Sequence, residues 1–161
     1  CDARNTLKKE GVEHFPILLK IAPDLTDDDK ADIAVSVLAM EIEGLIISNT
    51  TITRPASLTD SQKAEAGGLS GRPLKHISLG ILKEMYQATG GKILIVGVGG
   101  IETAADAYER IRAGASLIQL YSAMVYHGPY VAADIARGLA ELLRADGFEN
   151  ITDAIGIDTP I

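Results

Sequence analysis

The chain has 161 residues, about the size of one domain, and its 47 % hydrophobic and 23 % charged residues are typical of a soluble globular protein. Lys and Arg number 15 against 22 Asp and Glu, so the formal net charge is −7, and no basic cluster favours nucleic acid or an anionic membrane. The single cysteine, Cys1, excludes an intramolecular disulfide, and three scattered histidines exclude a Cys/His zinc site. Because Cys1 is not an initiator methionine, we expect a fragment or a processed piece.

Four short apolar runs predict strands that are buried on both faces, as in a parallel sheet. Residues 1–14, which precede them, are polar and predict no regular element. The first run, 15–22, contains Lys20 and is ended by Pro23. The other three runs are 44–49, 93–98 and 116–121.

Helical patterns occupy the segments between and after these runs. Thr26 is predicted to cap a helix that begins with three aspartates, 27–29, and ends near Glu41. Thr103 and Asp106 match a capping box in which Asp replaces the usual Glu. Two further helices, the second starting with Pro129 in its first turn, carry apolar stripes within 74–85 and 131–143.

The predicted order is a strand and a helix repeated four times, which indicates a parallel sheet with right-handed crossovers. Two α/β architectures fit this order, an open doubly wound sheet and part of a (βα)8 barrel. Four units are half of the eight in a barrel, and a complete barrel takes about 250 residues. In either fold, ligands bind where the carboxyl ends of the strands meet.

Lys20 is the most unusual residue of the predicted strands, because a buried ammonium is costly without an anionic or carbonyl partner. One interpretation is a cation held against an electron-rich ligand at the end of the first strand. The alternative is a lysine that reaches solvent or pairs with Asp24.

Glycines lie at the end of the third predicted strand, at 97, 99 and 100, directly before a helix. Such a loop lets backbone N–H groups approach an anion, which favours a phosphate site. Glu102 stands where a dinucleotide fingerprint would place its third glycine, so that motif is not supported. The alternative is a tight turn that needs glycine for its backbone alone.

A long polar stretch, 50–73, follows the second predicted strand, and its length favours a functional loop. It ends in the sequence GGLSG at 67–71, which either wraps a ligand with backbone donors or forms a plain turn. At its start, Asn49 and Thr50 are suited to hydrogen-bonding a planar polar substrate, or they simply form a turn.

Several short motifs occur in a fixed order along the chain. They are KIAPDL at 20–25, SNTT at 48–51, GGLSG at 67–71, GVGG at 97–100, RAGA at 112–115, QLYSA at 119–123, GP at 128–129 and TDAIG at 152–156. Together they resemble the motifs of the dihydroorotate dehydrogenase family, in its quinone-dependent, membrane-associated class 2. The resemblance covers nearly the whole chain but only the second half of the family's barrel.

The resemblance implies a fold and an activity. The fold is a (βα)8 TIM barrel, of which residues 1–161 would be the C-terminal part, that is, four βα units of an FMN-binding domain. The activity is the flavin-dependent oxidation of dihydroorotate to orotate in de novo pyrimidine biosynthesis, with ubiquinone as the electron acceptor. The location implied is peripheral, on the inner membrane, either at the bacterial cytoplasmic face or in the mitochondrion.

The resemblance also implies roles for individual residues. Lys20 would contact the pyrimidine edge of the flavin and favour its anionic reduced ring. Tyr121 and Ser122 would bind the FMN phosphate through their backbone, and Tyr121 would lie near the quinone passage. Asn49 and Thr50 would bind orotate. The remaining FMN contacts would be Ser48, Ser70, Gly71, Gly99 and Gly100.

One departure from the family pattern limits these expectations. The family's catalytic base is a serine that precedes the strand of Lys20, and the two helices for membrane and quinone also lie upstream. We therefore expect no catalytic residue in this chain, an inactive isolated fragment, and a need for the missing N-terminal half as partner. The alternatives are another FMN- or phosphate-binding barrel, of the glutamate synthase or inosine-monophosphate dehydrogenase kind, and a catalytically silent half-barrel scaffold.

Overall fold

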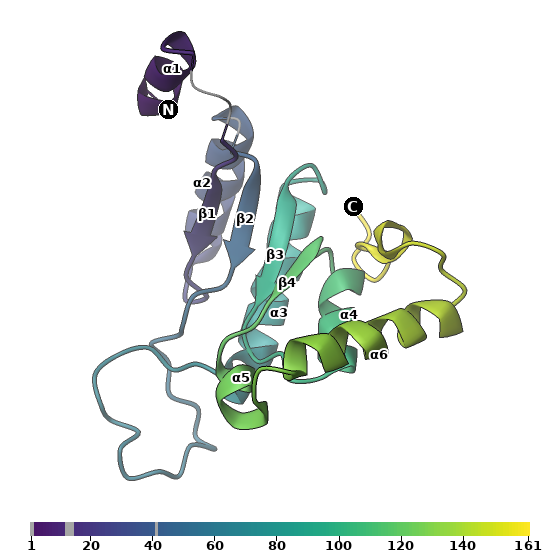
Figure 1. Ribbon diagram of the computed structural model, residues 1–161. Coiled ribbons are helices and arrows are strands. Elements are labelled where there is room, and N and C mark those ends of the chain that lie inside the picture. Colours follow the sequence, from purple (N-terminus) through teal and green to yellow (C-terminus); the bar gives the residue numbers. More distant parts are fainter. Residues whose placement is uncertain (1, 12–14, 41) are drawn as a thin grey trace.

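A four-stranded parallel sheet forms the centre of the computed structural model, which describes residues 2–11, 15–40 and 42–161 (Figure 1). Neighbours in the chain are neighbours in the sheet, without a reversal of order. A doubly wound sheet reverses its strand order at a switch point, whereas a barrel does not. The predicted half barrel is therefore confirmed. Its strands are β1 (Leu18–Ile21), β2 (Gly44–Ile47), β3 (Leu94–Val98) and β4 (Leu117–Gln119).

Each strand is followed by a helix, as predicted, and Figure 1 shows α2 and α3 behind the sheet. These four helices are α2 (Asp27–Ala39), α3 (Lys75–Ala88), α4 (Ala104–Arg112) and α6 (Val131–Ala145). Two α-helices that the sequence reasoning missed are α1 (Asp2–Lys9) and α5 (Ser122–His127). Two 3-10 turns complete the described elements, η1 (Arg72–Leu74) and η2 (Ile151–Ala154).

Both predicted capping boxes are present. The N–H of Asp29 donates to Thr26 Oγ1 at 3.2 Å, and the Asp29 carboxylate accepts the Thr26 N–H at 3.0 Å. Thr103 and Asp106 repeat this exchange at the start of α4, at 3.2 and 2.9 Å. The helix after Thr26 ends at Ala39, and its predicted end, Glu41, lies outside the described residues.

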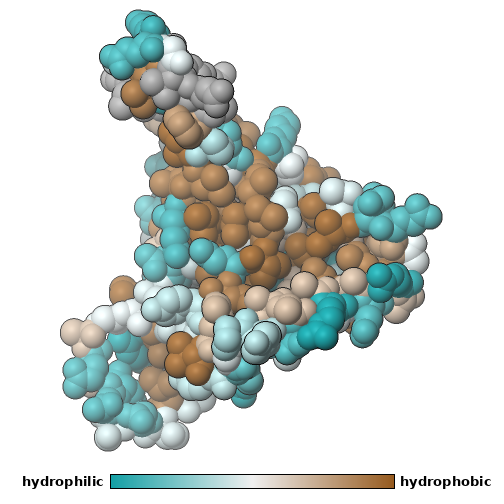
Figure 2. Space-filling model, viewed as in Figure 1, coloured by the Kyte–Doolittle hydropathy of each residue, from teal (hydrophilic) through white to brown (hydrophobic). Residues whose placement is uncertain are grey.

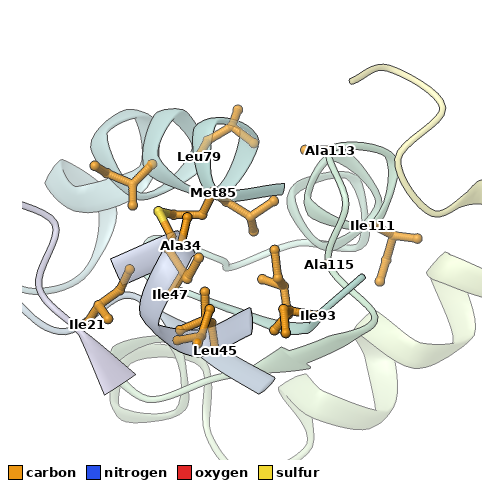
Figure 3. Close-up of a cluster of buried hydrophobic side chains, with 14 of the residues drawn as sticks. Ile21, Ala34, Leu45, Ile47, Leu79, Met85, Ile93, Ile111, Ala113 and Ala115 are labelled. Atoms are coloured by element: carbon orange, nitrogen blue, oxygen red, sulfur yellow. The ribbon is translucent and has the colours of Figure 1, made fainter. Parts of the chain in front are cut away.

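The core lies between the sheet and the helices that cover one of its faces. Figure 3 shows Leu45 and Ile47 of β2 together with Leu79 and Met85 of α3. Side chains alternate between the two faces of a strand, so the next residue along, Ile46, belongs to the opposite face. We call that opposite face, which also carries Leu18, Lys20, Val96 and Leu117, the inner face.

The expectation that all four strands are buried on both faces is wrong for β1 and β4. In β1 only Ile21 is buried, and Leu117 of β4 is 54 % exposed. Both are edge strands of the sheet, and in Figure 1 no described helix lies over the inner face of β1 and β2. Figure 2, viewed from this side, shows hydrophobic residues gathered over the strands.

Residues 50–71 form the long predicted loop, which projects beyond the carboxyl ends of the strands in Figure 1. Its two arms pair once, through an antiparallel bridge between Thr51 and Leu69. None of the helices in the described part of the chain is long and apolar enough to cross a bilayer.

Candidate functional site

A cleft of about 270 Å³ opens at the carboxyl ends of the four strands. Its walls come from Lys20 of β1 and from the ends of β3 and β4 and the segments after β2, β3 and β4, so it lies where the fold class predicts a ligand site. The ten residues to which the resemblance gives a role in binding FMN or orotate all line this one cleft, whereas Gly97 of the glycine loop and Gly67–Leu69 do not. The ten are Lys20, Ser48, Asn49, Thr50, Ser70, Gly71, Gly99, Gly100, Tyr121 and Ser122.

Lys20 stands on the inner face of β1, level with Ile46 of β2 and Val96 of β3. Its side chain is exposed rather than buried, which corrects the expectation of a buried ammonium. No hydrogen bond or ion pair joins Lys20 to another described residue, and Asp24, the alternative partner, is bound elsewhere. The ammonium is therefore available to a ligand in the cleft.

The segment after β2 presents three polar residues in sequence. Ser48 is buried, follows a cis peptide bond, and donates from Oγ to the Asn49 carbonyl at 3.0 Å. The Asn49 side chain accepts the N–H of Thr50 through Oδ1 at 2.8 Å. Its amide NH₂ donates to no other described residue, so the exposed Asn49 can offer two N–H donors to a ligand.

The glycine loop after β3 is shaped by close packing against α3. Gly100 has φ +68°, and a Cβ on it would lie 2.6 Å from the Lys75 Cα atom, so no side chain fits there. The N–H groups of Gly99 and Gly100 find no acceptor within the described ranges. Two backbone donors thus remain at the cleft wall, as the phosphate interpretation requires.

A buried polar cluster supports this loop from behind. Arg110 of α4 is 1 % exposed, and its Nη2 donates to the Gly99 carbonyl at 2.8 Å and to the Ser78 hydroxyl at 2.9 Å. Burial lowers the pKa of the Arg110 guanidinium to about 10, so it stays charged at neutral pH. Sequence reasoning missed Arg110, because nothing in a helical pattern distinguishes a buried arginine from an exposed one.

A second ionic group lies beside the loop, at the start of α4. Burial favours the protonated form of Asp106, but hydrogen bonds from Lys75, from the Glu102 N–H and from Thr103 prevail and lower its pKa. The hydrogen bond between Lys75 and Asp106 also raises the pKa of the Lys75 ammonium. This pair ties the first turn of α3 to the first turn of α4, on either side of the glycine loop.

The last wall of the cleft comes from the start of α5. Ser122 Oγ donates to Ser70 Oγ at 3.0 Å, which joins this helix to the end of the long loop. Tyr121, directly before it, is 80 % exposed. The N–H groups of Tyr121 and Ser122 have no acceptor in the part of the chain that the structure describes, so they resemble those of Gly99 and Gly100.

The long loop is held together by Arg54. Its guanidinium donates to the carbonyls of Lys63, Glu65 and Gly67 at 2.7 to 3.0 Å. It also reaches the carbonyls of Ile52 and Thr53 on the other arm, at 3.2 and 3.1 Å. Arg54 therefore closes the loop on itself, between the residues that line the cleft at its two ends.

Seven further residues line the cleft, and none of them was given a binding role from the sequence. Gln119 lies on the inner face of β4 and lines the cleft, and a glutamine in an apolar strand is the signal that could have revealed it. Glu102, the one carboxylate in the lining, accepts from Arg72 at 2.6 Å. The others are Leu74, Val98, Ile101, Leu120 and Ala123. No cluster of His, Cys, Asp and Glu in the described ranges could hold a metal ion.

Comparison with known proteins places the chain among relatives. The family model for dihydroorotate dehydrogenase matches residues 2–143. A dihydroorotate dehydrogenase (quinone) of Xanthobacter autotrophicus is 49 % identical over 155 residues, which cover 96 % of this chain and 43 % of the relative. The mitochondrial dihydroorotate dehydrogenase (quinone) of Mus musculus is 50 % identical over 155 residues, 96 % of this chain and 39 % of its own length.

Solved structures agree with the sequence matches. The crystal structure of DHODH from Eimeria tenella in complex with ferulenol superimposes with a TM-score of 0.88 at 49 % identity. The match covers 91 % of this chain and 39 % of that one. The chain thus spans about two fifths of the length of the relatives that it matches.

Proposed function

The chain belongs to the dihydroorotate dehydrogenase family, and we propose that it forms the flavin- and orotate-binding part of an enzyme that oxidises dihydroorotate to orotate and reduces a quinone. The observation that carries the proposal is the convergence of ten singled-out residues on one cleft. Two relatives named dihydroorotate dehydrogenase (quinone), which are 49 and 50 % identical in sequence to this chain, support the choice of reaction.

The walls of the cleft fit FMN. Gly99, Gly100, Tyr121 and Ser122 offer N–H groups suited to a phosphate, and a Cβ on Gly100 would displace the loop that carries two of them. The ammonium of Lys20 is suited to the electron-rich edge of the flavin ring. When bound, the flavin would accept the hydride of the substrate and pass two electrons to the quinone.

The residues after β2 are suited to the substrate. Asn49 offers its side-chain NH₂ to a carboxylate or carbonyl oxygen of orotate, while its Oδ1 is held by the N–H of Thr50. This internal bond orients the amide before any ligand arrives, which reduces the entropy lost on binding. Thr50 is packed beneath Gly68, since a Cβ on Gly68 would lie 1.8 Å from the Thr50 Oγ1 atom.

The proton of the substrate must go to a base, and we propose that another part of the barrel supplies it. Glu102 is the one carboxylate in the lining, and Arg72 already occupies it. The hydroxyl of Ser48 is committed to the Asn49 carbonyl. This arrangement leaves the chain with binding and orienting roles, and the isolated chain is expected to be inactive.

The rest of the barrel would also complete the sheet. Residues 1–161 would form the C-terminal part of the domain, with the equivalent of the relatives' remaining length pairing with the outer edges of β1 and β4. It would cover the inner face, where Leu18 and Leu117 are exposed. An unpaired parallel edge and an uncovered apolar face are both costly in water.

The electron acceptor suggests where the enzyme works. Ubiquinone is apolar and dissolves in the bilayer, so we propose that the enzyme lies peripherally on an inner membrane, in a bacterium or a mitochondrion. Exposed apolar and aromatic side chains on and beside α5, whose first residues line the cleft, support an entry for such a ligand. They are Tyr121, Met124, Val125, Tyr126 and Tyr130.

The test is a visible spectrum of the purified full-length protein, followed under anaerobic conditions. We expect a bound-flavin spectrum that dihydroorotate bleaches and a ubiquinone analogue restores. Asn49→Ala should raise the orotate Kd by about tenfold or more, the cost of one hydrogen bond to a charged group. Asn150→Ala is the control, since Asn150 is exposed and absent from the cleft.

Two results would contradict the proposal. A flavin spectrum that dihydroorotate leaves unchanged would favour another FMN-binding barrel. A colourless protein that takes up no FMN would favour a silent scaffold.

A further inference from the structure

Arg110 is a buried cation that the proposed function does not use. It is 1 % exposed, and it forms no salt bridge with a carboxylate in the described ranges. Its Nη2 makes all three of its hydrogen bonds, to the Lys75 carbonyl at 2.7 Å, the Gly99 carbonyl at 2.8 Å and the Ser78 hydroxyl at 2.9 Å. Nε and Nη1 are buried and have no hydrogen-bond partner among the residues that the structure describes. Burying a charge in this way is costly, which suggests a purpose beyond packing.

The acceptors of Arg110 belong to two segments, the start of α3 and the loop after β3. Lys75 begins α3, directly after the turn that follows Gly71, and Gly99 belongs to the loop after β3. Ser78, which is fully buried, donates to the Gly99 carbonyl as well, at 3.0 Å. Arg110 and Ser78 therefore hold the glycine loop against the start of α3, where the Gly100 Cα has no room for a side chain.

This contact also fixes the direction of one backbone donor. The carbonyl of Gly99 and the N–H of Gly100 belong to the same peptide plane, and in a trans peptide they point in opposite directions. Because the carbonyl faces Arg110, the N–H faces away from it, on the side of the cleft that Gly99 and Gly100 line. A charged donor on the carbonyl also polarises this N–H.

We propose that Arg110 is a positioning residue for the phosphate group of FMN. It holds the Gly99–Gly100 peptide so that its N–H meets the phosphate, and its charge adds a fixed positive potential behind that peptide. This inference rests on the proposed function, since it assumes that the cleft takes FMN. A purely structural Arg110 would instead join α3 to α4 without any preference for the phosphate.

The experiment separates phosphate recognition from general folding by comparing two ligands. The full-length protein is stripped of FMN, and the Kd values of FMN and of riboflavin, which lacks the phosphate, are measured from the quenching of flavin fluorescence. In Arg110→Met we expect the FMN Kd to rise about tenfold or more, and the riboflavin Kd to change less than about twofold. Arg137→Met is the matched control, because Arg137 is an exposed arginine of α6.

A conservative variant guards against misfolding. Arg110→Lys keeps the positive charge but loses the planar set of N–H donors of the guanidinium. Its FMN Kd should therefore lie between those of the wild type and Arg110→Met. The ³¹P chemical shift of bound FMN should also differ between Arg110→Lys and the wild type. This second readout stands even if Arg110→Met does not fold.

The outcomes distinguish the two claims. Equal changes in the FMN and riboflavin Kd values, or an unchanged ³¹P shift in Arg110→Lys, would overturn the role of Arg110 while leaving the proposed function intact. A wild-type protein that binds neither ligand would overturn the proposed function, and this inference with it.

Discussion

The hydroxyl of Thr51 donates a hydrogen bond to the carboxylate of Asp24, which lies between β1 and α2 and also accepts the Ile52 N–H at 2.9 Å. The two residues join the loop after β1 to the first residues of the long loop. Thr51 is fully buried, whereas Asp24 is exposed, so the contact fixes an exposed carboxylate to a buried hydroxyl. It engages the carboxylate that could otherwise neutralise Lys20, and it anchors the chain directly after Asn49 and Thr50.

Asp24→Ala should therefore weaken orotate binding without removing the flavin. Losing the anchor frees the segment after β2, and the expected rise in the orotate Kd is about tenfold, the cost of a hydrogen bond to a charged group. The measurement is an orotate titration of the flavin spectrum. Asp28→Ala is the control, because Asp28 is an exposed carboxylate of α2 that bonds no described residue. Equal orotate affinities in the two variants would show that the anchor is unimportant.

Lys20→Met should make the flavin harder to reduce. A cation beside the ring stabilises the electron-rich reduced form, so its removal should lower the two-electron midpoint potential by about 30 to 60 mV. The potential is measured by anaerobic reduction against a reference dye. Lys92→Met, an exposed lysine outside the cleft, should leave it unchanged. If the midpoint potential of the flavin is unchanged in Lys20→Met, the Lys20 ammonium does not lie beside the flavin ring.

Gly100→Ala should be far more damaging than Gly147→Ala. Both glycines have positive φ, +68° and +82°, so each alanine costs about 1 to 2 kcal/mol of backbone strain. Only Gly100 is also crowded, with Lys75 atoms 2.6 Å from its Cβ position, while Gly147 has nothing within 4 Å. Overpacking should add about 1 to 3 kcal/mol to the Gly100→Ala loss. Urea unfolding measures both, and equal losses would argue against the close approach.

Arg54→Ala should loosen the long loop. Its guanidinium joins the two arms through carbonyls such as those of Ile52 and Gly67, and without it those arms have one β-bridge left between them. Trypsin should then cleave after Lys63 several times faster than in the wild type, as followed by mass spectrometry. Arg137→Ala, a substitution on α6, should not alter the cleavage at Lys63. A loop that stays resistant would show that the bridge alone holds it.

Asp158→Asn should change the dependence of stability on pH. Hydrogen bonds from Arg112, at 2.8 Å, lower the pKa of Asp158 in the folded state. A lowered folded-state pKa stabilises the protein above the ordinary Asp pKa of about 3.9, and this gain disappears as the pH falls through the lowered value. The variant should melt about 2 °C below the wild type at pH 7.

That difference should vanish in acid, where the wild-type carboxyl is protonated as well. Thermal melts between pH 7 and pH 2 measure it, with Asp32→Asn as the control, since Asp32 is exposed and bonds no described residue. If the melting temperatures still differ at pH 2, the charge of Asp158 is not the cause of the difference.

Local patterns accounted for most of the elements. The capping boxes of Thr26 and Thr103 depend on residues three apart, so they are visible in the sequence and recur in the structure. The helix α5 was missed because its six residues are too few to show a period, and Gly128 and Pro129 directly after it interrupt the pattern.

The site was predicted less evenly, for a physical reason. Strand ends are local features, so Lys20 and Asn49 were found from position alone. Arg110 was not, because its role depends on contacts with Ser78 and Gly99, which are 32 and 11 residues away in the chain. The exposure of Leu117 was misjudged because an apolar strand has the same sequence pattern whether or not a second layer of structure covers its face.

The register of the sheet restricts where the length of this chain can vary during evolution. Lys20 lies level with Ile46 and Val96, and deleting one residue inside β1 would turn the lysine toward the helices and Leu19 toward the cleft. Insertions within 55–62, between the arms that Arg54 joins, would move none of these side chains. Natural length differences among functional relatives should therefore fall within that loop and spare the four strands.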